Sequence, residues 1–257
     1  MSHAYTPRER RIAIVYGILC HGTFAVGIAA MIAGIFTGLR LGHGPFIGAA
    51  ALGWDLLLVA QFVVLHSFLL TQRGRAVLAR LAPAGLGAPL STTTFALVSS
   101  LQLILTFTAW SRLGDVWWEP HGWLRVTITV AYAASWIFLL KTMSDAGMPV
   151  QTGFLGWSAV AREREPQFEG FRVRGMFRVV RQPVYLAFAC TLWTGPVWTP
   201  DHLLLAVSWT AYCVFGPRLK ERRYHEYYGE AFTRYRERVP YWIPTWRRVQ
   251  NEGTEPC

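Results

Sequence analysis

Charged residues are scarce in this chain. Only 16% of its 257 residues are Asp, Glu, Lys or Arg, whereas 53% are hydrophobic and 14% are aromatic. A soluble helical protein shows polar faces that repeat every 3.6 residues, but the long apolar segments here are apolar all round. The composition therefore excludes an ordinary soluble domain and predicts a polytopic membrane protein.

Cysteine is also scarce, and its spacing points to no particular chemistry. Three of the four cysteines lie inside apolar segments, and Cys257 is the last residue of the sequence. No CxxC pair and no Cys/His ligand spacing occurs, so the sequence indicates neither a zinc site nor a disulfide framework. We expect no bound metal.

Lysine is almost absent. Lys141 and Lys220 are the only two, so arginine supplies nearly all of the net charge of +10. A basic balance would also suit nucleic acid, but these arginines flank apolar segments and alternate with neutral or acidic loops, which is the positive-inside pattern. We therefore assign the charge mostly to membrane topology, with both termini in the cytoplasm, and predict no nucleic-acid partner.

Six apolar segments make up most of the chain. A bilayer core about 30 Å thick requires roughly 20 apolar residues per helix, and four segments meet or approach that length. These are 12–36, 46–70, 93–110 and 123–140, followed by two shorter ones, 184–199 and 202–216. The first is too long for a secretory signal peptide and has no cleavage site, so we expect it to be retained.

These lengths predict an all-α membrane bundle of five to six transmembrane helices, with the two short segments forming a broken helical hairpin. The chain divides at residue 142: residues 1–142 hold the four long segments, and residues 143–257 hold a polar connector, the hairpin and a tail rich in Tyr, Arg and Glu. In the tail, 217–228 and 230–238 have helical patterns on either side of Gly229. We predict that these tail helices lie in the cytoplasm.

The hairpin opens with "VVRQPVYLAF", residues 179–188. Pro183 suits the first turn of a helix, where its missing N–H costs no hydrogen bond. Arg181 and Gln182 then lie at the membrane–water boundary. Irregular polar backbone at that depth is tolerated where it is buried in protein or faces a cavity. Two interpretations stay open: the segment borders a cytoplasmic pocket, or Arg181 merely extends to the lipid headgroups.

This segment and the tail resemble the integral-membrane methyltransferases, which include isoprenylcysteine carboxyl methyltransferases and bacterial phospholipid N-methyltransferases. That family carries Arg-His-Pro-x-Tyr, then Glu-Glu, then Gly-x-x-Tyr-x-x-Tyr and Val-Pro. The matching residues here are Arg181, Pro183, Tyr185, Glu221, Gly229, Tyr235, Val239 and Pro240. Gln182 stands in place of the family's His, Lys220 in place of its first Glu, and Phe232 in place of its first Tyr.

Other stretches are similar to one subgroup, which contains bacterial methanethiol S-methyltransferases and nitrite-reduction-associated membrane proteins. They are "LHSFLLTQRGRAVLARLAP", "STTTFALVSSLQLIL", "GFLGWSAV" and "WTGPVWTPDHLLLAV". The subgroup's His-Ser pair at the end of its second span is matched by His66–Ser67. The resemblance implies an enzyme of the bacterial inner membrane, in contact with lipid, that uses S-adenosylmethionine to methylate a small thiol such as methanethiol.

The resemblance also implies that residues 143–257 bind the cofactor on the cytoplasmic side. An arginine suits the cofactor's carboxylate, Glu221 its amine or ribose, and tyrosine rings its adenine or sulfonium. For Tyr224 and Tyr228, simple packing at the interface is an equally good interpretation. The expected cofactor-binding residues are Arg181, Gln182, Pro183, Tyr185, Glu221, Tyr224 and Tyr228.

A thiol must lose its proton to become the nucleophile. Gln182 cannot titrate, so a base has to be sought elsewhere. His66, near the cytoplasmic end of its span, is the first candidate, and His225, on the same helix face as Glu221, is the second. The alternative for His66 is a hydrogen bond to a neighbouring helix. The catalytic candidates are therefore His66, Glu221 and His225.

Two other functions stay open from the sequence. The methyl acceptor is instead a lipid-like prenylcysteine carboxylate or phospholipid amine, or the protein is a non-catalytic or haem-binding membrane factor of nitrogen-oxide metabolism. Haem ligation requires a histidine at membrane depth, for which His21 and His66 qualify. We interpret His21 and Gln102 as groups that form hydrogen bonds between helices, and Asp55 as one that holds helices together. Nothing in the sequence sets the oligomeric state.

Overall fold

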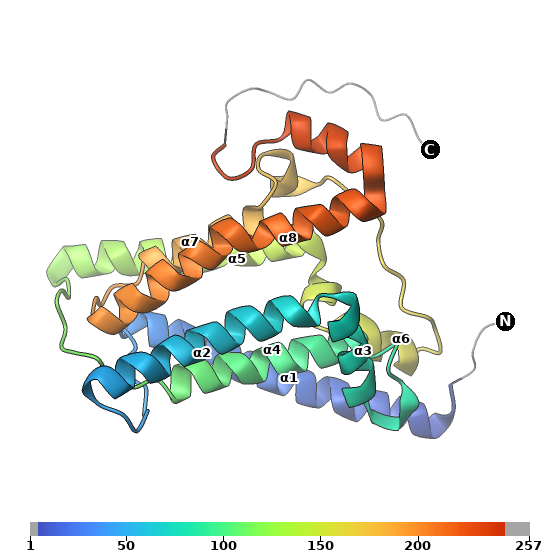
Figure 1. The fold of residues 1–257 in the computed structure, drawn as a ribbon, viewed down its shortest axis with the longest axis horizontal. Coiled ribbons are helices and arrows are strands. Elements are labelled where there is room, and N and C mark those ends of the chain that lie inside the picture. Colours follow the sequence, from blue (N-terminus) through green and yellow to red (C-terminus); the bar gives the residue numbers. More distant parts are fainter. Residues whose placement is uncertain (1–4, 245–257) are drawn as a thin grey trace.

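The computed structural model describes residues 5–244. All secondary-structure elements in that range are helices (Figure 1). The predicted all-α bundle is confirmed. The α-helices are α1 (Pro7–Phe36), α2 (Gly48–Leu69), α3 (Gln72–Leu81), α4 (Ser91–Thr108), α5 (Gly122–Gln151), α6 (Phe154–Ala161), α7 (Pro183–Trp193) and α8 (Pro200–Arg238). Two 3-10 turns, η1 (Pro83–Gly85) and η2 (Gly175–Arg178), join some of them.

Four helices, α1, α2, α4 and α5, are long and apolar enough to cross a membrane. α7 has only 11 residues and packs against the apolar first half of α8, which gives the predicted broken hairpin. The long helices expose many large apolar side chains on their outer surface, such as Ile18 (67% exposed) and Ile137 (68% exposed). Such a surface suits contact with lipid. The chain is therefore an integral membrane protein.

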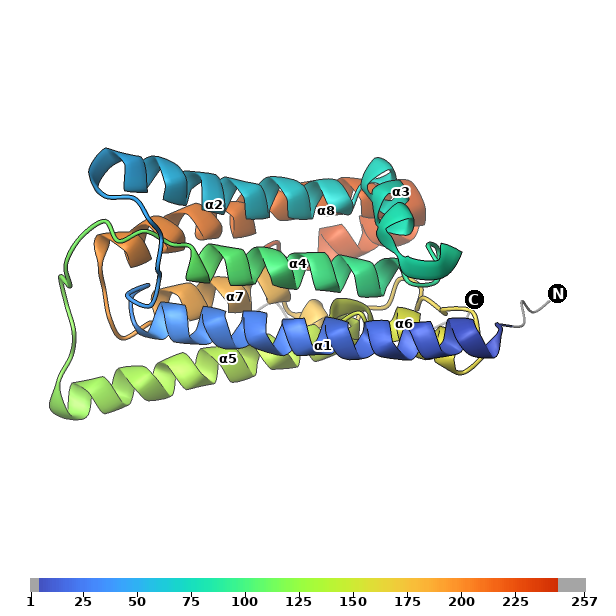
Figure 2. The same ribbon diagram turned by 90° about the horizontal axis from the view of Figure 1, so that it is seen from below.

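The six membrane-associated helices run roughly along one axis (Figures 1 and 2). One end of the bundle, on the right of both views, holds the start of α1 together with α3 and α6. α8 leaves the bundle at this same end. The loops at the opposite end carry Arg40 and Arg112 together with Asp115 and Glu119, so basic and acidic residues balance there. The basic excess of the described residues therefore lies at the end that holds α3, α6 and the tail of α8.

Local sequence explains where several helices begin. Thr6 caps α1: its hydroxyl accepts from the backbone N–H of Glu9, whose carboxylate accepts from the N–H of Thr6. Pro183 is the first residue of α7, as predicted. Thr199 caps α8 through the backbone N–H of His202, at 3.0 Å. The entrances of the first and last membrane helices are thus fixed by the residues just before them.

Polar residues within the bundle hold helices to one another. Gln102 on α4 donates to the side-chain and backbone oxygens of Gln61 on α2, both at 3.0 Å. His21 on α1 accepts from the indole N–H of Trp157 on α6, also at 3.0 Å. The predicted interhelical roles of Gln102 and His21 are confirmed. A buried Asp55 accepts from the backbone N–H of Ser111, which ties α2 to the loop after α4.

α5 is longer than predicted. It continues past residue 140 to Gln151, bending at Gly147, where φ is +99°, just before Pro149. A proline and a positive-φ glycine so close together account for the bend without ending the helix. α5 therefore runs through the boundary predicted at residue 142, and the division into two functional parts stays a prediction.

α8 carries the chain out of the bundle and back over it. It continues through Pro217 as one helix until Gly229, where φ is +49° and ψ is −122°. The chain reverses there, and 230–238 folds back above α7 and α8 (Figure 1). The predicted break at Gly229 is confirmed. The returning segment packs through Phe232, Tyr235 and Val239 against Phe171 of the connector.

Candidate active site

The start of α7 and the middle of α8 meet at a shared carboxylate. Glu221 Oε1 accepts from Arg181 Nε at 2.9 Å and from Gln182 Nε2 at 2.8 Å. The Arg181 and Glu221 side chains are only 11% and 12% exposed, so the pair is nearly removed from water. Both donors use the same oxygen, and within residues 5–244 no hydrogen bond engages Oε2 of Glu221.

Arg181 also holds the returning tail. Its Nη1 donates to the backbone oxygens of Arg236 and Val239, both at 2.7 Å, and its backbone N–H donates to Pro240. Its guanidinium lies 5.4 Å from the centre of the Tyr241 ring, a cation–π distance. Arg181 is thus the residue that joins α7, α8 and the last described residues. Its guanidinium is already hydrogen-bonded to protein, rather than left for a lipid headgroup.

Gln182 carries an unusual unpaired atom. The side chain is only 2% exposed, and its Oε1 is buried without a hydrogen-bond partner in the described part of the chain. A buried acceptor without a partner costs free energy, so such an atom in a native structure calls for a partner. The amide nitrogen of Gln182 is meanwhile held by the shared carboxylate of Glu221, so Gln182 helps to fix that carboxylate in place.

A pocket of about 450 Å³ lies against this cluster. That size is within the range of small-molecule sites. It is lined by Arg181, Arg218, Glu221, Arg222, His225, Arg236 and Tyr241. Three of the residues expected from the sequence, Arg181, Glu221 and His225, are therefore brought together around one pocket. The lining is strongly basic, and the free oxygen of Glu221 is its acidic group.

The expected tyrosines lie beside this pocket and not in its lining. Tyr224 and Tyr228 pack against Phe171 in the aromatic cluster that holds the returning tail. This is the packing role that the sequence left open for them. Tyr185, on α7, lies against Tyr212 of α8 with ring centres 6.3 Å apart.

The two histidines predicted as bases lie in very different places. His66 lies between α2 and α4, with Nδ1 3.2 Å from the Ser99 hydroxyl, stacked on Phe62 and tilted against Phe95. It does not line the basic pocket. His225 does line it but is exposed, and its Nδ1 is 3.3 Å from the Thr233 hydroxyl.

Sequence reasoning missed Lys220 as a site residue. Its Nζ lies 5.2 Å from the ring centre of Tyr224, 5.5 Å from Phe177 and 6.0 Å from Tyr185. These rings come from α8, η2 and α7, so three elements enclose the amine. Lys220 is one of two lysines in the chain, and it replaces an acidic residue of the resembled pattern. That substitution was the signal that could have found it.

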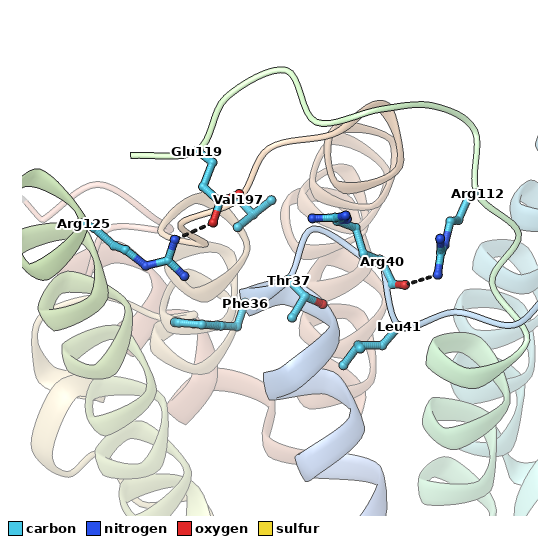
Figure 3. A pocket seen from close by; sticks show the side chains of 8 residues that line it. All are labelled: Phe36, Thr37, Arg40, Leu41, Arg112, Glu119, Arg125 and Val197. Carbon is cyan, nitrogen blue, oxygen red and sulfur yellow. Dashed lines mark hydrogen bonds and ion pairs between the residues drawn. The ribbon is translucent and has the colours of Figure 1, made fainter. Parts of the chain in front are cut away.

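A second pocket, of about 300 Å³, lies at the opposite end of the bundle (Figure 3). There Arg112 donates to the Arg40 carbonyl at 2.8 Å, and Arg125 forms an ion pair with Glu119. None of the residues expected from the sequence lines it. The basic pocket on α7 and α8 is therefore the candidate active site.

The chain is similar to known proteins along most of its length. The family model described as NnrU protein matches residues 56–251. Methanethiol S-methyltransferase 1 of Bradyrhizobium diazoefficiens is 32% identical over 92% of this chain and 83% of that protein. A methanethiol S-methyltransferase of a Pseudomonas species is 27% identical over 93% and 92%, and Nurim of Mus musculus is 28% identical over 63% and 64%. No solved structure matches.

Proposed function

The chain belongs to the NnrU protein family, and on that premise we propose that it is a membrane methyltransferase that methylates the sulfur of a small thiol. The thiol is methanethiol, the methyl donor is S-adenosylmethionine, and the product is dimethyl sulfide. The observation that carries the proposal is the sequence similarity to methanethiol S-methyltransferases, which extends over more than nine tenths of the chain. The basic pocket at the α7–α8 junction supports it.

The residues of the pocket fit S-adenosylmethionine. Its carboxylate matches the guanidinium groups of Arg218 and Arg222, because arginine binds carboxylates well. Its amine or ribose hydroxyls match the free Oε2 of Glu221. When bound, the donor supplies an activated methyl group. The protein's own contribution is to hold the reacting atoms in line, from which much of the rate can come.

Orientation follows from charge. The basic end of the bundle holds α3, α6, the tail of α8 and the candidate site. By the positive-inside rule this end faces the cytoplasm. In a bacterium the membrane is then the inner membrane, and the pocket opens to the compartment where S-adenosylmethionine is made. The thiol, being small and apolar, reaches the site from lipid or from water.

Purified protein in detergent, supplied with methanethiol and S-adenosylmethionine, is expected to produce dimethyl sulfide, measured in the headspace. Calorimetric titration is expected to show binding of S-adenosylhomocysteine, the demethylated donor, to the same preparation. Binding without dimethyl sulfide would point to a lipid-like acceptor and overturn the thiol substrate. Folded protein that binds no S-adenosylhomocysteine would overturn the methyltransferase itself.

Arg222→Ala is expected to weaken binding of S-adenosylhomocysteine about tenfold or more, because a charge-assisted hydrogen bond contributes about 1.5–3 kcal/mol. Arg222 is exposed in the pocket lining and has no ion pair within the described residues, so its loss should leave the melting temperature unchanged. Arg234→Ala is the matched control, because Arg234 lies outside the pocket lining and its ion pair, with Glu230 at 3.9 Å, is exposed. Equal affinity in both variants would remove Arg222 from the site.

A further inference from the structure

Lys220 lies next to the site in surroundings that are mostly aromatic. Its Nζ faces Phe177, Tyr185 and Tyr224 at 5.2–6.0 Å, and among residues 5–244 it has no hydrogen bond or ion pair. The other lysine, Lys141, is by contrast hydrogen-bonded to both carboxylate oxygens of Asp145. Aromatic faces attract a cation but accept none of its hydrogen bonds well, so the Lys220 amine lacks the usual partners of an ammonium.

Removal from water favours the neutral amine. Burial is the main cause that lowers the pKa of Lys220, to about 8. Two charged neighbours on α8 act in opposite directions, since Glu221 raises this pKa and Arg223 lowers it. From α7 and η2 the amine faces the Tyr185 and Phe177 rings, and neither element contributes a charged neighbour to its pKa among the described residues. A bound sulfonium in the adjacent pocket, being a cation, would lower the pKa of Lys220 further.

The position of Lys220 suits contact with a thiol. Its neighbour in sequence, Glu221, lines the pocket, while Lys220 points to the rings between α7 and α8. Tyr185 leads on to Tyr212, whose hydroxyl accepts from Ser67 at the end of α2, at 3.4 Å. Lys220 therefore lies among aromatic rings of α7, η2 and α8, one residue before the pocket-lining Glu221. Such apolar surroundings suit a small apolar thiol.

We propose that Lys220 is the group that takes the proton of the thiol, an inference that rests on the proposed function. The neutral amine accepts the S–H proton and becomes an ammonium. The thiolate sulfur then forms a bond to the methyl carbon, the bond from that carbon to the sulfonium sulfur breaks, and its electron pair stays on the departing thioether. Lys220 returns its proton to water. This assigns to Lys220 the role that Gln182 cannot fill.

Lys220 can be observed directly because the chain has only two lysines. In protein carrying isotope-labelled lysine, with Lys141→Arg to leave a single side-chain signal, NMR titration in detergent is expected to give Lys220 a pKa near 8. This readout needs no turnover. A midpoint near that of free lysine, about 10.4, would overturn the proposal.

Kinetics test the same assignment. Wild-type activity should rise with pH and level off above about 8, because only the neutral amine accepts a proton. Lys220→Met, of similar size, should lose about 100-fold or more on methanethiol, and its residual rate should keep rising about tenfold per pH unit as thiolate forms in solution. Lys220→Arg places a permanently protonated group there that cannot accept the thiol proton, so it should be equally impaired.

Two thiols with the same carbon skeleton but different acidity separate proton transfer from structure. With 2,2,2-trifluoroethanethiol, which ionises far more readily than ethanethiol, Lys220→Met should come within about tenfold of wild type while remaining at least about 100-fold impaired with ethanethiol. Equal losses with both thiols, or full activity of Lys220→Met on methanethiol, would overturn the role of Lys220. A wild type that binds S-adenosylhomocysteine but yields no dimethyl sulfide would overturn the thiol function instead, leaving the NMR result to stand on its own.

Discussion

Replacing Glu221 with alanine is expected to destabilise the protein by about 3 kcal/mol and to abolish binding of S-adenosylhomocysteine. Removal of one partner of a buried ion pair costs about 3–5 kcal/mol, because the other charge is left without compensation. The lower value applies here because Arg181 keeps the carbonyls of Arg236 and Val239 as acceptors. The loss of stability can be measured by thermal unfolding in detergent, and the loss of binding by calorimetry.

Two further variants make the Glu221 result specific. Glu230→Ala removes another acid of α8. The ion pair of Glu230 with Arg234 is 3.9 Å long and mostly exposed, so its loss should lower the free energy of unfolding by less than about 1 kcal/mol. Glu221→Gln keeps an acceptor for Arg181 and should recover most of the stability while still failing to neutralise the ligand amine. If Glu221→Ala melted like wild type and still bound S-adenosylhomocysteine, the α7–α8 junction would not be the site.

Gly229→Ala is expected to weaken binding of S-adenosylhomocysteine about 10–100-fold while leaving the melting of the membrane helices unchanged. The backbone at Gly229, with φ +49° and ψ −122°, is one that residues with a side chain avoid at a cost of about 1–3 kcal/mol. A Cβ there would meet nothing within 4 Å, so the effect is one of backbone conformation alone. The strain opposes the reversal that brings Arg236 and Tyr241 to the pocket.

The control for Gly229 is Gly170→Ala. Gly170 also has open space around it but lacks a positive φ, so alanine there should change neither affinity nor stability by more than about 0.5 kcal/mol. Limited proteolysis should cleave the tail of Gly229→Ala faster than that of wild type. An affinity unchanged in Gly229→Ala would show that the returning segment does not complete the pocket.

The membrane helices could be predicted because their length is set by the bilayer. α1, α2, α4 and α5 each contain an apolar run that no soluble fold requires, and that signal is independent of their neighbours. α6 could not be predicted in this way. Its eight residues are too short to carry a periodic signal, and it is positioned by its neighbours, through Trp157 against His21 and the Thr93 hydroxyl.

The candidate site could likewise be predicted only in part. The motif residues Arg181 and Glu221 could be placed near one another from the resembled pattern, and His225 could be added because it shares the helix face of Glu221. Their pairing could not be predicted. That Arg181 and Gln182 share one oxygen of a carboxylate 39–40 residues away depends on how α7 and α8 cross, and no local sequence encodes that crossing. The aromatic enclosure of Lys220 depends on three elements and was missed for the same reason.

The clamp of Arg181 on the returning tail has a consequence for biosynthesis. The backbone oxygens that it binds belong to Arg236, Val239 and Pro240, which leave the ribosome after every membrane helix has been made. During translation the six apolar helices can enter the lipid while the pocket still lacks its outer wall. A nascent chain stopped at Gly229 would therefore be inserted but inert. The site is complete only once residues 230–240 have packed against the connector and the start of α7.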